Sequence, residues 1–177
     1  MPVIIHVFLK VSNGIFRKKN VKSFPMQDKE RKEFYMSAAL EEAHFAQRRG
    51  EVPVGAVVSS EGKILSRGHN QSISLHDATA HAEIIAIRNA CSILQNYRLS
   101  GCDLYVTLEP CVMCVGAALQ ARLHGLYFGA YDPKTGACGS AVGIPFDKLN
   151  HQMEVSGGIL EKECGQILKD FFKEKRG

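Results

Sequence analysis

Four residues in two short motifs constrain this chain more than any other feature of its sequence. His81 and Glu83 stand two residues apart, and Cys111 and Cys114 follow later in a Pro-Cys-x-x-Cys motif. Imidazole and thiolate groups are preferred zinc ligands, and a catalytic zinc site uses three protein ligands and keeps its last position for water. The sequence therefore predicts a zinc site made by His81, Cys111 and Cys114, which leaves Glu83 to act as the proton shuttle.

The spacing within each motif separates ligands from base. Cys111 and Cys114 are three residues apart, so a helix that starts at Pro110 would place both sulfurs on one face. The N-terminus of such a helix favours anions and would help to keep both cysteines as thiolates. If residues 80–92 form a helix, His81 and Glu83 point in different directions. One can then bind the metal while the other reaches its water.

The composition is that of one ordinary domain. The 177 residues are 45% hydrophobic and 23% charged, which is enough for one well-filled core. A formal charge of +4 permits an RNA partner but does not argue for one. Of the six cysteines, only Cys111 and Cys114 have metal-ligand spacing, and the other four are interpreted as packing residues.

Hydrophobic periodicity predicts an alternating α/β chain. The expected helices and strands follow in this order: a helix over 28–49, strands over 54–58 and 63–68 joined by a loop over 59–62, a helix over 80–92, a strand over 104–108, a helix over 112–121, a strand over 126–130 and a terminal helix over 159–175. Strand, helix and strand over 104–130 imply a right-handed parallel crossover. We therefore expect a three-layer α/β/α domain with a central sheet of about five strands.

The zinc motifs belong to a longer series that resembles a known family. The matching segments are Pro53–Val57, Asn70, His76–Glu83, Gln95–Leu99, Leu104–Cys114 and Asp132–Gly136. His-x-Glu followed by Pro-Cys-x-x-Cys resembles the cytidine and adenosine deaminase superfamily. The whole series, from about residue 28 to the C-terminus, resembles the bacterial tRNA-specific adenosine deaminases. The resemblance implies a cytidine-deaminase-like fold.

The resemblance also implies a reaction, which is the hydrolytic deamination of adenosine to inosine at the wobble position of a tRNA anticodon loop. One Zn²⁺ per subunit would lower the pKa of a water molecule from about 16 toward 7, and Glu83 would move the protons. The family places Asn70, Val54, Leu108 and Asp132 at the substrate. By themselves they would be interpreted as a turn residue, two core residues and a loop cap. Glu109 is interpreted as an ordinary strand end without a chemical role.

Several expectations concern the partners of this chain. Residues 169–176 mix aromatic and basic side chains, which suits RNA, although the sequence alone favours an amphipathic helix with solvated lysines. The resemblance favours RNA, a homodimer, and a cytoplasmic location without a membrane. The small-residue segment 115–119 could pack against the second copy, and packing on its own sheet is the alternative. His69 and Tyr131 depart from the family, because relatives carry Trp and Arg there.

The first 25 residues form an extension that precedes the predicted domain, residues 26–177. An apolar stretch there is followed by basic residues, the reverse of a secretory signal, and it is too short to span a membrane. We expect a poorly ordered extension, with Met26 as a candidate true start. A transit peptide and a basic RNA contact are the alternatives.

Two other functions remain open from the sequence. One is deamination of a free base or nucleotide, such as cytosine, guanine or deoxycytidylate, because the metal chemistry is the same. The other is a structural zinc or RNA-binding module, which would need a fourth protein ligand such as His76 or Cys138.

Overall fold

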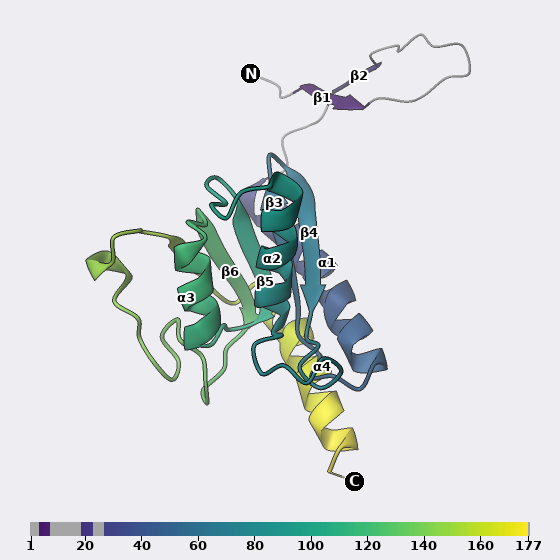
Figure 1. Cartoon of the computed structure of the whole chain (residues 1–177). Coiled ribbons are helices and arrows are strands. Elements are labelled where there is room, and N and C mark those ends of the chain that lie inside the picture. The colour runs from purple at the N-terminus through teal and green to yellow at the C-terminus, as the bar shows by residue number, and fades with distance from the viewer. Residues whose placement is uncertain (1–3, 8–18, 23–26, 177) are drawn as a thin grey trace. The chain divides into compact units, whose positions relative to one another are not determined.

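The computed structural model describes residues 4–7, 19–22 and 27–176. Within the predicted extension, strands β1 (Ile4–Val7) and β2 (Lys19–Lys22) pair antiparallel in a two-stranded sheet of their own (Figure 1). The other residues of the extension, and with them the expectation of poor order and of a start at Met26, lie outside the described residues. None of the helices in the described ranges combines the length and the apolar character needed to cross a bilayer.

The main sheet has five strands in the order β4-β3-β5-β6-β7. Their bounds are β3 Gly55–Ser60, β4 Lys63–His69, β5 Asp103–Leu108, β6 Gly125–Ala130 and β7 Glu154–Ser156. Strand β3 pairs antiparallel with both β4 and β5, whereas β5, β6 and β7 are parallel. The sheet therefore contains the predicted parallel crossover from β5 to β6.

Helices cover both faces of the sheet, as the sequence predicted (Figure 1). Helices α2 (Ala82–Leu94) and α3 (Val112–Gln120) pack over one face, against a core cluster that includes Val58, Leu104 and Leu126. Helices α1 (Asp28–Arg48) and α4 (Glu161–Glu174) cover the other face, where the cluster includes Tyr105 and Tyr127. Successive residues of a strand point to opposite faces, so both faces of these central strands are apolar. The three-layer α/β/α architecture is confirmed.

Two glycines allow helices to approach the sheet closely. A Cβ on Gly55 would lie 2.1 Å from the carbonyl oxygen of Ala39 in α1, and a Cβ on Gly68 would lie 2.5 Å from that of Ala82 in α2. Real side chains do not fit at such distances, so each position needs glycine. The close approach at Gly55 brings α1 against strand β3, and that at Gly68 brings the start of α2 against strand β4.

The predicted boundaries were wrong in several places. The β3–β4 connection is a two-residue turn at Glu61 and Gly62, both with positive φ, so Ser59 and Ser60 belong to the strand rather than to a four-residue loop. Strand β7 was not predicted, because three residues are too few to show an alternating pattern. Helix α4 begins at Glu161, two residues later than expected. A single turn of 3-10 helix, which is not among the expected helices and strands, lies at Phe146–Lys148.

Candidate metal centre and active site

His81 lies immediately before α2 rather than within it. Its backbone is extended, with φ −73° and ψ 153°, and it occupies the N-cap position. The side-chain oxygen of Asn70 accepts a hydrogen bond from the N–H of Ala82 at 2.8 Å, which satisfies one of the free amides at this helix end. The prediction of a helical His81 was therefore wrong. The cap conformation nevertheless separates His81 from Glu83, since only Glu83 belongs to the first turn.

Cys111 has the same position on α3 that His81 has on α2. It is the N-cap residue with φ −75° and ψ 172°, so Pro110 precedes the helix and does not start it as predicted. Cys114 lies in the first turn and is buried, with 1% of its surface exposed. The two helix starts lie side by side at the carboxyl end of β5 (Figure 1), which is the edge where α/β sheets usually bind ligands.

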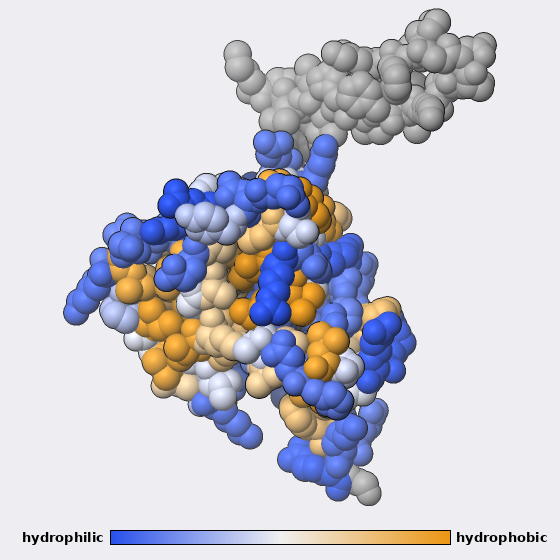
Figure 2. Space-filling view, in the orientation of Figure 1, coloured by the Kyte–Doolittle hydropathy of each residue, from blue (hydrophilic) through white to orange (hydrophobic). Residues whose placement is uncertain are grey.

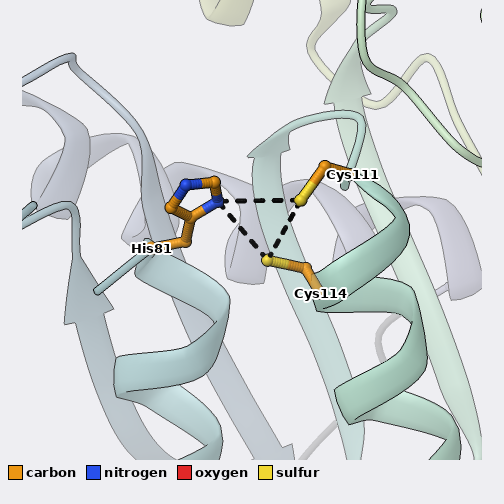
Figure 3. Close-up of side chains that lie close together, drawn as sticks. All are labelled: His81, Cys111 and Cys114. Atoms are coloured by element: carbon orange, nitrogen blue, oxygen red, sulfur yellow. Dashed lines mark hydrogen bonds between the residues drawn. The ribbon is translucent and has the colours of Figure 1, made fainter. Parts of the chain in front are cut away.

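These three residues bring their ligand atoms into one small triangle (Figure 3). The two Sγ atoms are 3.8 Å apart, and Nδ1 of His81 lies 3.8 Å from Sγ of Cys111 and 3.6 Å from Sγ of Cys114. A tetrahedral zinc with bonds of about 2.3 Å to sulfur and about 2.05 Å to nitrogen separates two sulfurs by about 3.8 Å and a sulfur and a nitrogen by about 3.6 Å. The triangle therefore has the size that a tetrahedral zinc requires.

Close contact between the two thiols shifts their pKa values in opposite directions. Hydrogen bonds from Cys114 and His81 lower the pKa of Cys111 to about 3. The hydrogen bond to Cys111, together with burial, raises the pKa of Cys114. The hydrogen bond with Cys111 in turn raises the pKa of His81. One negative charge is thus easily formed at this site, whereas a second one needs a cation to balance it, as a divalent metal would do.

Glu83 reaches this triangle from the first turn of α2. This residue is 4% exposed, and its carboxyl group interacts with the thiol of Cys114. Burial raises the pKa of Glu83, because a low-dielectric environment disfavours the charged form. A buried carboxyl group beside three metal-binding atoms is suited to hold and transfer a proton near neutral pH.

The four predicted substrate contacts form two pairs. Asn70 and Val54 are neighbours, since the N–H of Asn70 donates to the carbonyl oxygen of Val54 at 3.1 Å, and Asn70 also contacts the start of α2. Leu108 and Asp132 both line a cavity of about 550 Å³. Most of its other walls come from the end of β6 and the loop after it and from the C-terminal segment that contains α4. The other lining residues are Val52, Ala130, Tyr131, Pro133, Lys134, Thr135, Gly165, Leu168, Lys169, Phe172 and Arg176.

Asp132 has a defined role within its own loop. Its carboxylate accepts hydrogen bonds from the N–H of Lys134 at 2.9 Å and from the hydroxyl of Thr135 at 2.5 Å. Burial acts in the opposite direction, but these hydrogen bonds lower the pKa of Asp132. The carboxylate is therefore held in its charged form, and the loop-cap interpretation and the substrate contact are compatible.

Two buried carboxylates to which the sequence interpretation gave no role support the walls of this site. Glu51 is 2% exposed and accepts hydrogen bonds from the N–H groups of Ile73 and Ser74, in the loop that leads to His81. Glu109 is also 2% exposed and binds the loop after β6, so its interpretation as an ordinary strand end was wrong. The sequence did contain one signal for the role of Glu109, which is its position directly before the Pro-Cys motif.

No fourth protein ligand joins the triangle within the described ranges. The group of His, Cys, Asp and Glu side chains that could hold a metal contains His81, Cys111 and Cys114 alone among those residues. Neither His76 nor Cys138, the two candidates for a closed site, contributes a ligand atom to it. Three protein ligands are the pattern of catalytic zinc, which argues against a purely structural zinc module.

Comparisons with known proteins agree with this geometry. A family model described as MafB19-like deaminase matches residues 30–176. A tRNA-specific adenosine deaminase of Haemophilus influenzae is 52% identical over 143 residues, which cover 80% of this chain and 83% of that protein. A solved structure from a study of A-to-I editing by tRNA:A34 deaminases at the wobble position is 46% identical, with a TM-score of 0.71 over 76% of this chain and 99% of the other.

A guanine deaminase from Bacillus subtilis is a further structural relative. It is 37% identical, with a TM-score of 0.55 over 60% of this chain and 66% of that one. The identity to the tRNA enzymes is higher and extends over more of both chains. On the deaminase model over residues 30–176 and the 52% identity to the Haemophilus enzyme, the chain belongs to the family of tRNA-specific adenosine deaminases.

Proposed function

We propose that this protein is a zinc-dependent hydrolase that converts adenosine to inosine at the wobble position of a tRNA anticodon loop. The observation that carries the proposal is the triangle of one nitrogen and two sulfur atoms, sized for zinc, with the buried Glu83 carboxyl beside it. Family membership supports the choice of adenosine in tRNA as the substrate. A tRNA substrate also supports a cytoplasmic location.

His81, Cys111 and Cys114 would hold one Zn²⁺ per subunit. When bound, zinc would lower the pKa of a coordinated water molecule and so supply a nucleophile near neutral pH. Glu83 would accept the proton that this water loses and deliver it to N1 of the adenine ring as the C6–O bond forms. The remaining hydroxyl proton on C6 would then pass through the same carboxyl to N6, which would leave as ammonia as the C6–N6 bond breaks and the C6=O bond of inosine forms.

The predicted contacts would position the flipped base and its neighbours. Asn70 is fixed through its Oδ1 by the N–H of Ala82, so its side-chain NH₂ group is oriented and can donate to the nucleotide. Val54 and Leu108 would supply the apolar surface that an unstacked base requires. Leu108 and Asp132 extend this contact into the cavity of about 550 Å³, which has room for a flanking nucleotide.

The rim of that cavity supports the predicted RNA contact of the C-terminal helix. Three cations, Lys134, Lys169 and Arg176, and two aromatic rings, Tyr131 and Phe172, line it. Lysine and arginine bind phosphates, and aromatic rings stack on unpaired bases. Tyr131, which stands where relatives carry Arg, is 52% exposed and can still stack.

Removal of two of these cations should weaken RNA binding in a salt-dependent way. For the double variant Lys169→Ala/Arg176→Ala we expect weaker binding of an anticodon stem-loop. We also expect a shallower slope of log K against log salt, by about 0.7 for each single-strand phosphate that the variant no longer neutralises. Fluorescence anisotropy at several salt concentrations measures both. Lys162→Ala, on the same helix but outside the cavity lining, is the matched control and should keep the parent slope. An unchanged slope in the double variant would place the RNA elsewhere.

The surface of α3 supports the predicted homodimer. Figure 2 shows apolar surface gathered over this helix, where Val112 is 54% exposed and Gly116 and Ala117 are half-buried. A Cβ added to Gly116 would meet no atom of this chain within 4 Å. Specific nucleic-acid interfaces commonly bury about 1,000 Å² or more of protein surface, and a second copy packed on α3 would contribute part of that area.

Gly116→Arg should separate the subunits without harm to the zinc site. The arginine has open space in the single chain but would block a close-packed second copy. We therefore expect a folded, zinc-loaded monomer that loses most of its activity on tRNA, measured by light scattering, metal analysis and inosine formation. His44→Arg, an exposed position on α1 over the other face of the sheet, is the matched control. A Gly116→Arg monomer that deaminates tRNA at the parent rate would rule out the need for a dimer.

One alternative function has a specific observation in its favour. The guanine deaminase relative from Bacillus subtilis suggests deamination of a free base, which needs the same zinc and carboxyl groups.

A direct assay separates the two functions. The protein is incubated with total tRNA, the RNA is sequenced for inosine at the anticodon, and the same preparation is tested on free guanine, adenine, cytosine and deoxycytidylate. We expect inosine at the wobble position and little activity on the free compounds. Activity on a free base with none on tRNA would select the alternative.

A further inference from the structure

The loop that follows β6 is held in place by one buried carboxylate. Both oxygens of Glu109 are used: Oε1 accepts from the N–H groups of Cys138 at 2.9 Å and Ser140 at 3.1 Å. Oε2 accepts from the N–H of Asp132 at 3.1 Å and from the hydroxyl of Ser140. One side chain thus receives four hydrogen bonds from both ends of a nine-residue segment, 132–140.

The loop is shaped around this carboxylate. A Cβ on Gly136 would lie 2.5 Å from Cδ and Oε2 of Glu109, so the loop passes so close that only glycine fits there. Pro110, the residue after Glu109 in the β5–α3 connection, also holds the loop. Its carbonyl oxygen accepts a hydrogen bond from the N–H of Ala137 at 2.8 Å. The following residue is Cys111, one member of the metal-binding triangle. Of these three consecutive residues, Glu109 and Pro110 therefore anchor the loop, and Cys111 provides a metal ligand.

We infer that Glu109 is a positioning residue that fixes the Tyr131–Thr135 wall of the RNA-facing cavity relative to the metal centre. The inference rests on the proposed function, since that wall carries Asp132 and the rim cation Lys134. Hydrogen bonds to a charged acceptor are stronger than neutral ones, and four on one carboxylate leave the loop little freedom. Glu109 acts through this loop, and the mechanism assigns it no proton transfer.

Glutamine is the sharpest replacement because it keeps the shape of glutamate. Glu109→Gln exchanges one acceptor oxygen for an NH₂ group, which then faces the N–H donors of the loop. We expect full zinc content and a KM for an anticodon stem-loop raised about 10-fold with kcat little changed, as removal of a charge-assisted hydrogen bond would give. Hydrogen exchange should become faster at the amides of Asp132, Cys138 and Ser140, a result that does not depend on activity.

Controls and outcomes separate this inference from the proposed function. Glu163→Gln, at an exposed position of α4 outside the cavity lining, should match the parent in every measurement. If Glu109→Gln does not fold, Ser140→Ala removes one of the four donors and should give a smaller rise in KM and faster exchange at Asp132. If the variant that is measured has the same KM and the same hydrogen-exchange rates as the parent protein, the inference is overturned. A parent protein that is inactive on the stem-loop overturns the proposed function, and the inference with it.

Discussion

Glu83→Ala should remove most of the deaminase activity while leaving zinc bound. Glu83 is not part of the metal-binding triangle, but its buried carboxyl lies against Cys114 and would carry both proton transfers. General acid–base catalysis contributes about 100-fold to 10,000-fold, so kcat on an anticodon stem-loop should fall by about that factor. Glu83→Gln should behave in the same way, since an amide has the shape of the carboxyl group but cannot accept the proton.

Metal analysis tests whether zinc stays bound, and single-turnover inosine formation measures the loss of rate. Glu163→Ala, an exposed glutamate on α4, serves as the control and should retain both zinc and rate. Retention of the parent rate in either Glu83 variant would remove Glu83 from the mechanism. Loss of zinc in both would instead make Glu83 a part of the metal site.

Cys111→Ala and Cys114→Ala should each lose both zinc and stability. The two sulfurs come from the N-cap and the first turn of α3, so a metal bound between them and His81 ties two helix starts together. A ligand at about 100 times its dissociation constant stabilises the folded state by about 2.7 kcal/mol, and a variant that cannot bind zinc lacks this contribution.

Metal content and thermal unfolding, with and without added zinc, test the ligand assignment. Added zinc should raise the melting temperature of the parent protein but not those of the two variants. A chelator should lower the melting temperature of the parent protein toward those of the variants. Cys91→Ala is the matched control, because Cys91 is outside the triangle and should keep full occupancy. Full zinc content in Cys111→Ala or Cys114→Ala would refute the assignment of that cysteine.

Local chemistry explains why the sequence predicted so much of the site. The Pro-Cys-x-x-Cys spacing forces two sulfurs onto one short stretch of chain, whatever the rest of the fold does. His-x-Glu similarly separates an imidazole from a carboxyl group by two residues. Apolar strands alternating with amphipathic helices leave few arrangements other than a sheet covered on both faces. The fold class and the candidate ligand set therefore follow from short-range patterns, and the structure brings that set together.

Tertiary contacts add what those patterns do not contain. His81 and Cys111 lie just outside their helices as N-cap residues, and the oxygen that accepts from the first amide of α2 comes from Asn70, twelve residues before Ala82. Strand β7 exists because β6 offers it a parallel edge, although its three residues have little strand signal of their own.

The roles of Glu51 and Glu109 depend on distance along the chain. Glu51 binds backbone amides 22 and 23 residues away, and Glu109 binds amides 23, 29 and 31 residues away. A buried carboxylate is stable only when donors surround it, and those donors are assembled by the fold. Residue types and their spacing were enough to identify the atoms that can bind a metal and the class of fold that carries them. They could not identify the carboxylates that hold the loops around that metal centre, because hydrogen bonds between distant segments form only once the sheet and its helices have brought them together.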